Sequence, residues 1–191
     1  MRSVPKKGRR EGAGFDEGGE AGFTLIELLV VLLIIGILLA IAIPTFLSVT
    51  KSANNTAAQS NLQTAFTGAK TYFEAANQTY TGIETSTAYS NIKQVDTGLS
   101  FVTNTSASTT SNVVSVYSGG TDVVLVSFSA PTKDCWGIED VTAAGSTKWS
   151  NGGTAIGTYF GVVRATTSSN CVANTFAPPA ANITTSGFPH G

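Results

Sequence analysis

Few residues of this chain have side chains that could catalyse a reaction. Its one histidine, His190, has no carboxylate near it in the sequence, and the Gly-x-Ser-x-Gly pattern of many hydrolase nucleophiles does not occur. Four acidic residues of the second half are expected to be solvated loop charges: Asp122, Asp134, Glu139 and Asp140. A calcium site formed by the last three is an alternative that we do not favour. We therefore expect no enzyme, no cofactor and no metal site.

One long apolar stretch carries the main signal of the sequence. The 21 residues from Phe23 to Ile43 include a single charged residue, Glu27. As an α-helix they would be roughly 31 Å long, which is enough to cross the hydrocarbon core of a bilayer. The sequence therefore predicts a helix that is held in a membrane at some stage.

Glu27 needs a partner, because a carboxylate within lipid is costly. A cut after Gly22 would create a free ammonium within one helical turn of Glu27. A cation on a neighbouring copy of the same helix is the other candidate. The alternative to both is a signal-anchor helix that carries an isolated glutamate at its headgroup end.

The six residues 22–27, GFTLIE, followed by an unbroken apolar run, resemble the class III signal of type IV pilins. This resemblance covers about 25 residues. It implies that a prepilin peptidase cuts after Gly22 and methylates the new amine of Phe23. It also implies that Glu27 pairs with the amine of an adjacent subunit during assembly, and that Pro44 is the position at which the helix bends.

The composition agrees with one helical stalk and one small globular domain. The chain has 191 residues, is 42% hydrophobic and has a mean hydropathy of +0.16. Only 12% of its residues are charged and the net charge is −1, so the electrostatics predict no basic surface for nucleic acid, and binding to nucleic acid stays open.

The sequence divides into five predicted segments. Residues 1–22 form a leader without a fold, whose five basic residues favour the cytoplasmic side despite interspersed acids. No small-x-small cleavage site follows the apolar run, which argues against an ordinary secretory signal. The other segments are a hydrophobic helix over 23–44, its amphipathic half over 45–80, a β-sheet domain over 81–177 and a flexible, proline-punctuated tail over 178–191.

An α+β fold is predicted, in which one long helix packs on an antiparallel sheet. Apolar residues at steps of three and four indicate that the helix runs from about Thr24 to about Asn77, interrupted or bent near Pro44 and loosened at Gly68. Its apolar stripe consists of Leu62, Phe66, Ala69, Phe73, Ala76 and Tyr80. About four strands are expected, with one face on this stripe, from the runs 99–103, 113–117, 123–128, 136–141 and 158–165.

The two cysteines, Cys135 and Cys171, are most simply a disulfide, because the membrane topology places the domain outside the cytoplasm. Two buried free thiols are the alternative. Many type IV pilins have a cysteine pair near the C-terminus that bounds a surface region, and these residues resemble that pair by position.

The sequence as a whole predicts a structural subunit of a type IV pilus, with roles in adhesion, motility or DNA uptake. Its expected partners are copies of itself, the prepilin peptidase, the pilus assembly platform and the cytoplasmic membrane. It would be a single-pass protein with its C-terminal domain outside before assembly, and extracellular afterwards. The alternatives are a pseudopilin of a type II secretion or competence system, an adhesive minor pilin and a monomeric signal-anchored protein.

Overall fold

The computed structural model describes residues 22–84, 92, 96–145, 148–149 and 155–189. The chain divides into two compact units, Met1–Ile43 and Pro44–Gly191, and each is described by itself. The predicted leader, apart from its last residue, and His190 lie outside the described residues.

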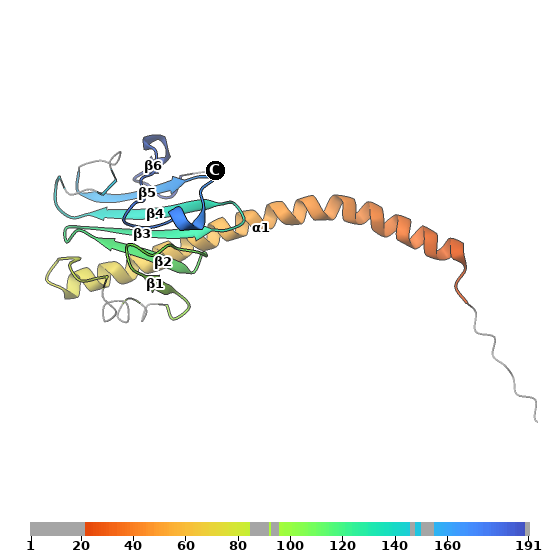
Figure 1. Ribbon diagram of the computed structural model, residues 1–191, viewed down its shortest axis with the longest axis horizontal. Coiled ribbons are helices and arrows are strands. Elements are labelled where there is room, and N and C mark those ends of the chain that lie inside the picture. Colours follow the sequence, from red (N-terminus) through yellow and green to blue (C-terminus); the bar gives the residue numbers. More distant parts are fainter. Residues whose placement is uncertain (1–21, 85–91, 93–95, 146–147, 150–154, 190–191) are drawn as a thin grey trace, which may run out of the picture. The chain divides into compact units, whose positions relative to one another are not determined.

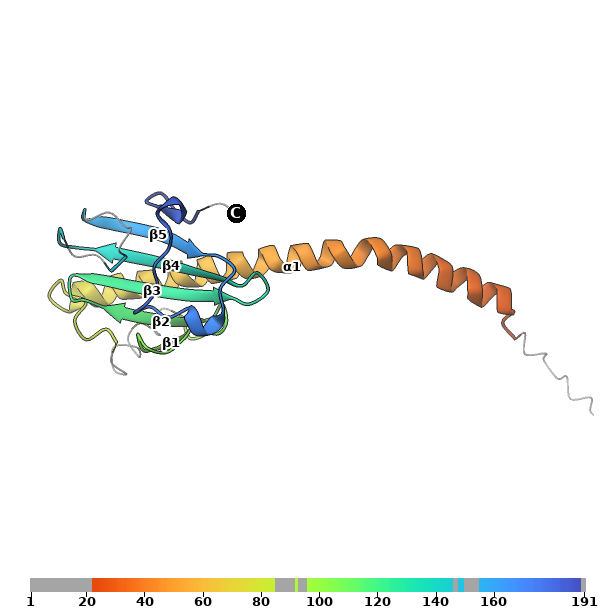
Figure 2. The same cartoon turned by 45° about the horizontal axis from the view of Figure 1, so that its top comes forward.

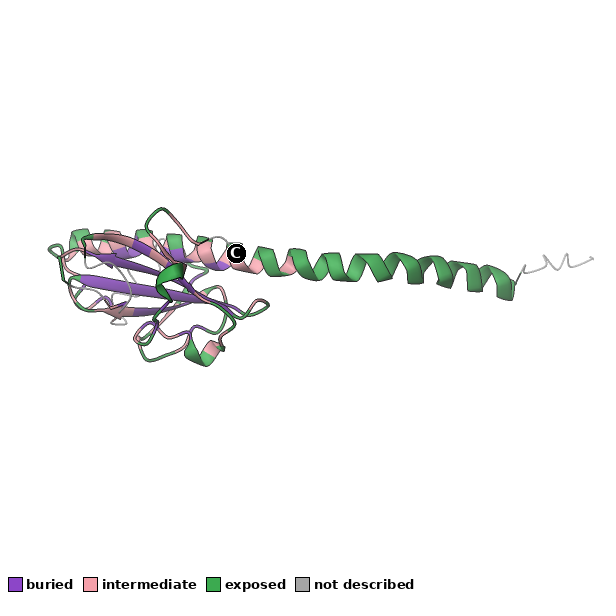
Figure 3. Cartoon of the chain, turned by 90° about the horizontal axis from the view of Figure 1, so that it is seen from above, coloured by how far each residue is buried: buried purple, intermediate pink, exposed green. Residues whose placement is uncertain are grey.

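Helix α1 runs from Leu25 to Ala75 without a break (Figure 1). It continues through Pro44, although proline lacks the N–H that would bond to the carbonyl of the preceding turn. The interruption considered near Pro44 is therefore wrong, whereas the bend expected there and the loosening expected at Gly68 stay predictions. In the first unit the large apolar side chains from Phe23 to Ile43 are between 45% and 87% exposed, as the green part of the helix in Figure 3 shows.

The second half of α1 packs on the sheet through one stripe of small and apolar residues. Ala58, Leu62, Ala65 and Ala69 are buried at helical spacing, and Tyr80 is buried just beyond the helix. Phe66 and Phe73 pack against the same cluster but remain partly exposed. The predicted stripe is thus confirmed at Leu62 and Ala69 and in part at Phe66 and Phe73, whereas Ala76 and Tyr80 lie beyond the end of α1 at Ala75.

Among the described residues six strands form one sheet in the order of the sequence. They are β1 (Ser100–Val102), β2 (Val113–Ser118), β3 (Asp122–Ser129), β4 (Asp134–Val141), β5 (Gly157–Val163) and β6 (Ile183–Thr184). Figure 2 shows β1 to β5 side by side in that order. Neighbouring strands are antiparallel except β1 and β2, which pair in parallel. The predicted sheet was mostly right, but it lacked β6 and the parallel edge.

Both faces of the sheet are covered, whereas the sequence predicted a cover on one. Every residue of β3 and β4 is buried. On the face away from α1, a second apolar cluster includes Trp149, Ala173 and Phe176 beside the odd-numbered residues of β4. Two 3₁₀ turns, η1 (Ser168–Asn170) and η2 (Ala180–Asn182), flank this covering segment.

The expected flexible tail over 178–191 is corrected for residues 178–189. Strand β6 pairs with β5 through Phe160 and Gly161. The ring of Phe188 meets the rings of Trp136 and Phe160 edge-on, with centroids 5.8 and 5.1 Å apart. The two aromatic contacts and the pairing at the sheet edge hold this segment on the domain, although its composition alone is typical of a flexible tail.

Candidate functional site

Glu27 lies in the first turn of α1 and is bonded to Thr24. Its Oε2 accepts hydrogen bonds from the Thr24 backbone N–H at 2.8 Å and from the Thr24 hydroxyl at 2.7 Å. The Glu27 N–H donates in return to Thr24 Oγ1 at 3.3 Å. This reciprocal pair is a capping box, and Thr-x-x-Glu is its sequence signature, so the partner could have been predicted from residues 24–27. No hydrogen bond reaches Glu27 Oε1 among the described residues.

The side chains around Glu27 are apolar. Phe23, Ile26, Val30 and Val31 line a shallow hollow of about 390 Å³ beside the carboxylate. Among the described residues α1 alone is long and apolar enough to cross a membrane, and no residue of its most apolar window is buried. A charged group therefore lies next to an apolar surface that the described residues do not cover.

Gly22 and Phe23 precede the helix and are exposed. A Cβ placed on Gly22 would meet no atom within 4 Å. Nothing within the described chain therefore requires glycine at this position.

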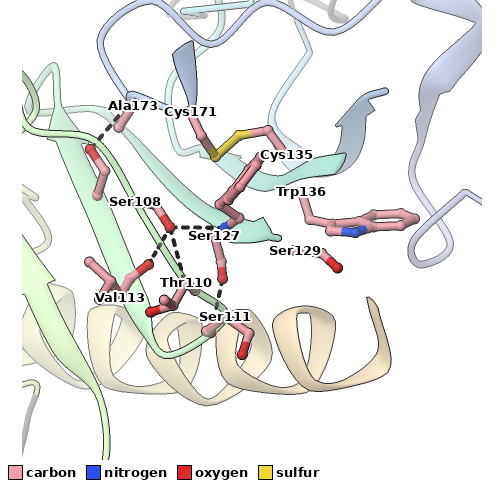
Figure 4. Close-up of a disulfide and its surroundings, with 12 residues drawn as sticks. Ser108, Thr110, Ser111, Val113, Ser127, Ser129, Cys135, Trp136, Cys171 and Ala173 are labelled. Carbon is pink, nitrogen blue, oxygen red and sulfur yellow. Dashed lines mark hydrogen bonds between the residues drawn. A yellow bond between two sulfur atoms is a disulfide. The ribbon is translucent and has the colours of Figure 1, made fainter. Parts of the chain in front are cut away.

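The predicted disulfide between Cys135 and Cys171 is confirmed (Figure 4). Both cysteines are buried, and the bond joins β4 to the segment that follows η1. The hydroxyl of Ser108 supports this junction by accepting the Phe128 N–H at 2.8 Å, and the Ser108 N–H donates to the Cys171 carbonyl at 2.8 Å. By the chain-entropy estimate, closing such a loop stabilises the fold by about 4 kcal/mol.

The four acidic residues expected in loops lie instead in strands β3 and β4 and are buried, which corrects the prediction. Asp140 accepts from Lys70 Nζ at 2.7 Å, from the Tyr80 hydroxyl at 2.7 Å and from Thr158 Oγ1 at 2.8 Å. Burial, together with the hydrogen bond to Asp140 and the negative charge of that carboxylate, raises the pKa of Tyr80. The sheet thus uses this carboxylate to hold α1 and β5.

The other three carboxylates have separate surroundings. Glu139 accepts from the backbone N–H groups of Lys148 and Trp149, the latter at 3.2 Å. Asp134 lies 3.7 Å from Arg164 Nη1. Burial raises the pKa of Asp122, and the nearby Lys148 opposes that shift.

The calcium alternative is wrong for geometric reasons. Glu139 and Asp140 are adjacent in a strand and point to opposite faces. Asp134 is six residues from Asp140, about 20 Å along the strand. Within the described part of the chain, no group of three acidic, histidine or cysteine residues could hold a metal ion.

Residues 19–43 match the family model described as prokaryotic N-terminal methylation motif. The type IV major pilin protein PilA of Myxococcus xanthus is 48% identical over 52 residues, 27% of this chain and 24% of that protein. In Thermus thermophilus, the type IV wide pilus major component PilA4 is 33% identical over 100 residues, 52% of this chain and 76% of that protein. The narrow pilus major component PilA5 is 42% identical over 64 residues, covering 34% of this chain and 52% of that protein. No solved structure matches.

Proposed function

Because this chain belongs to the type IV pilins, we propose that it is the major structural subunit of a type IV pilus. It is made as a membrane-anchored precursor and polymerises through α1 into an extracellular filament. Three relatives whose names describe major pilins or major pilus components support the major role over a minor adhesive pilin or a pseudopilin.

The observation that carries the proposal is the bare apolar part of α1. Its large side chains are at least 45% exposed in the single chain, an apolar surface that water does not tolerate. Lipid covers it before assembly, and the same helices of other copies cover it in the filament. Close packing then replaces lipid contacts.

Processing between Gly22 and Phe23 supplies the charge that assembly needs. A prepilin peptidase would reach the exposed backbone before α1, cut after Gly22 and methylate the amine of Phe23. Glu27 Oε2 is occupied by Thr24, so Oε1 is the oxygen open to the ammonium of an adjacent copy. Because an unpaired carboxylate is costly in an apolar core, this pair sets the axial position of each incoming subunit.

Mass spectrometry of material sheared from the cell surface tests the proposal. We expect a peptide that begins at Phe23 and is one methyl group heavier than its sequence, abundant in a high-molecular-weight fraction. A processed chain that stays scarce outside the membrane would favour the pseudopilin. A mature product that retains residues 1–22 would contradict the proposal.

A further inference from the structure

The charged residues of the unit Pro44–Gly191 gather at its two ends. At the end nearest Pro44 along α1, here called the proximal end, Asn55 Nδ2 donates to Asp134 Oδ2 at 3.4 Å where β4 begins. At the opposite, distal end, Lys70 Nζ lies 2.7 Å from Asp140 Oδ2 where β4 finishes. Helix and strand therefore run side by side, and contacts and sheet register assign each charged residue to an end.

The two ends carry opposite charge. The proximal end has three cations and one carboxylate, net +2: Lys51 one turn before Asn55, Lys133 and Arg164 beside Asp134, and Asp134 itself. The distal end has two cations and five carboxylates, net −3: Lys70, Lys148, Glu74, Glu84, Asp122, Glu139 and Asp140. Of the described charges in this unit, Asp96 alone belongs to neither end.

Three of these charges are exposed and have no partner within the described chain. The side chains of Lys51 and Lys133 at the proximal end, and of Glu74 at the distal end, form no hydrogen bond or ion pair there. Lys51 and Glu74 are 23 residues apart on one helix, which is about 35 Å. They cannot meet within one copy.

We propose that Lys51 and Lys133 of one copy pair with Glu74 of a second copy of this chain, displaced by about 35 Å along the filament. This rests on the proposed function, since it needs a filament. Opposite charges at the two ends favour head-to-tail contact, and like charges oppose any contact of two proximal or two distal ends. Lipid phosphates could also attract the two lysines, but they would leave Glu74 without a role, whereas a second copy accounts for all three residues.

Zero-length cross-linking tests the contact directly. A carbodiimide joins a lysine amine to a glutamate carboxylate with loss of one water, and only when the two groups touch. Filaments should give the peptide pair Lys51 to Glu74 or Lys133 to Glu74, and detergent-solubilised single subunits should give neither. If Glu74 in filaments is captured by added glycinamide but never by either lysine, the proposal is wrong.

Charge reversal tests the pairing by a second route. The variant Lys51→Glu with Lys133→Glu places two carboxylates opposite Glu74 of the next copy, and Glu74→Lys places a cation opposite the two lysines. Each alone should lower the yield of sheared filaments by at least about fivefold. All three changes in one chain should restore the yield, as should coexpression of the two variants.

The outcomes separate this proposal from its rivals. The proposal is overturned if Lys51→Glu with Lys133→Glu lowers the filament yield while Glu74→Lys has no effect, either by itself or when added to the two lysine changes. In that case the lysines serve the membrane surface. Formation of the disulfide in each variant shows that it has folded. Absence of filaments from the unaltered chain would instead contradict the proposed function.

Discussion

At the scale of single residues, Asp140 shows how a buried charge organises this domain. Its carboxylate is almost fully buried and accepts from Lys70, Tyr80 and Thr158, which come from the helix, the segment after it and β5. A buried carboxylate without such partners would be strongly destabilising. Removing one partner should therefore cost more than removing an ordinary surface hydrogen bond.

Tyr80→Phe should lower the free energy of unfolding by about 1.5 to 3 kcal/mol, because it removes a hydrogen bond to a charged group and keeps the ring. Tyr72→Phe is the matched control, since the Tyr72 hydroxyl donates to the neutral carbonyl of Thr81 at 2.7 Å and should cost about 0.5 to 1.5 kcal/mol. Urea denaturation of the detergent-solubilised chain measures both. Equal losses would show that Asp140 does not depend on Tyr80.

Asp122→Asn should stabilise the chain at neutral pH. Burial raises the pKa of Asp122 above its ordinary value of 3.8, so the folded chain holds this proton more tightly than the unfolded chain does. Stability from this group therefore falls as the pH rises from the ordinary pKa through the raised one, and is lowest above it. Thermal unfolding from pH 3 to 8 should show a gain that disappears towards the acid end. A gain that is constant with pH would contradict this explanation.

At the scale of elements, the sequence predicted those whose signal is local. The runs of β-branched residues in β2, β3 and β5 are found within one or two residues of their expected ends. The helical stripe could be predicted from the spacing of apolar residues, and the disulfide from the cysteine pair together with the membrane topology. The capping box of Thr24 and Glu27 also has a local sequence signature. It was missed because the charge of Glu27 suggested partners outside its own helical turn.

The missed elements depend on contacts between distant segments. Strands β1 and β6 have three and two residues, too few for any periodicity. The acidic residues of β4 looked solvated because their partners lie far away: Lys70 is 70 residues from Asp140. Covering of the second sheet face depends on Phe176, which sits among prolines and polar residues typical of a tail.

Gly137 is the position at which β4 admits this covering segment. A Cβ there would lie 2.3 Å from Phe176 Cε1. Gly137→Ala should therefore destabilise the domain by about 1 to 3 kcal/mol, through overpacking. Phe176→Leu in the same chain should recover part of that loss, and a double-mutant cycle measured by urea denaturation quantifies the coupling. Additive losses would show that the two residues do not touch.

At the scale of the whole molecule, the proposed function assigns polymerisation to one unit and the filament surface to the other. Met1–Ile43 carries the apolar helix, and Pro44–Gly191 carries the sheet, the disulfide and the charged ends. Glu27 is the single charged residue between Phe23 and Ile43. An experiment can distinguish its role as a helix cap from its role as the partner of a second copy.

Glu27→Ala should leave membrane insertion and cleavage intact and abolish filaments, because the ammonium of the adjacent copy loses its partner. Glu27→Gln is the decisive companion, since glutamine fits a capping box but carries no charge. If pairing is the role, it should fail to assemble as well. Sheared filaments and the N-terminal peptide of the membrane fraction are the two measurements. Normal filaments from Glu27→Gln would show that Glu27 acts as a helix cap and that its charge is not needed for assembly.

The bare apolar helix also decides where a filament of this chain can grow. In the proposed function lipid covers that surface before assembly, so the supply of free subunits would be confined to the two dimensions of the membrane. New copies would then join the proposed filament at its base, and each addition would move the older copies outward. The tip would be the oldest part of such a fibre, and the distance of a subunit from the cell would increase with its age.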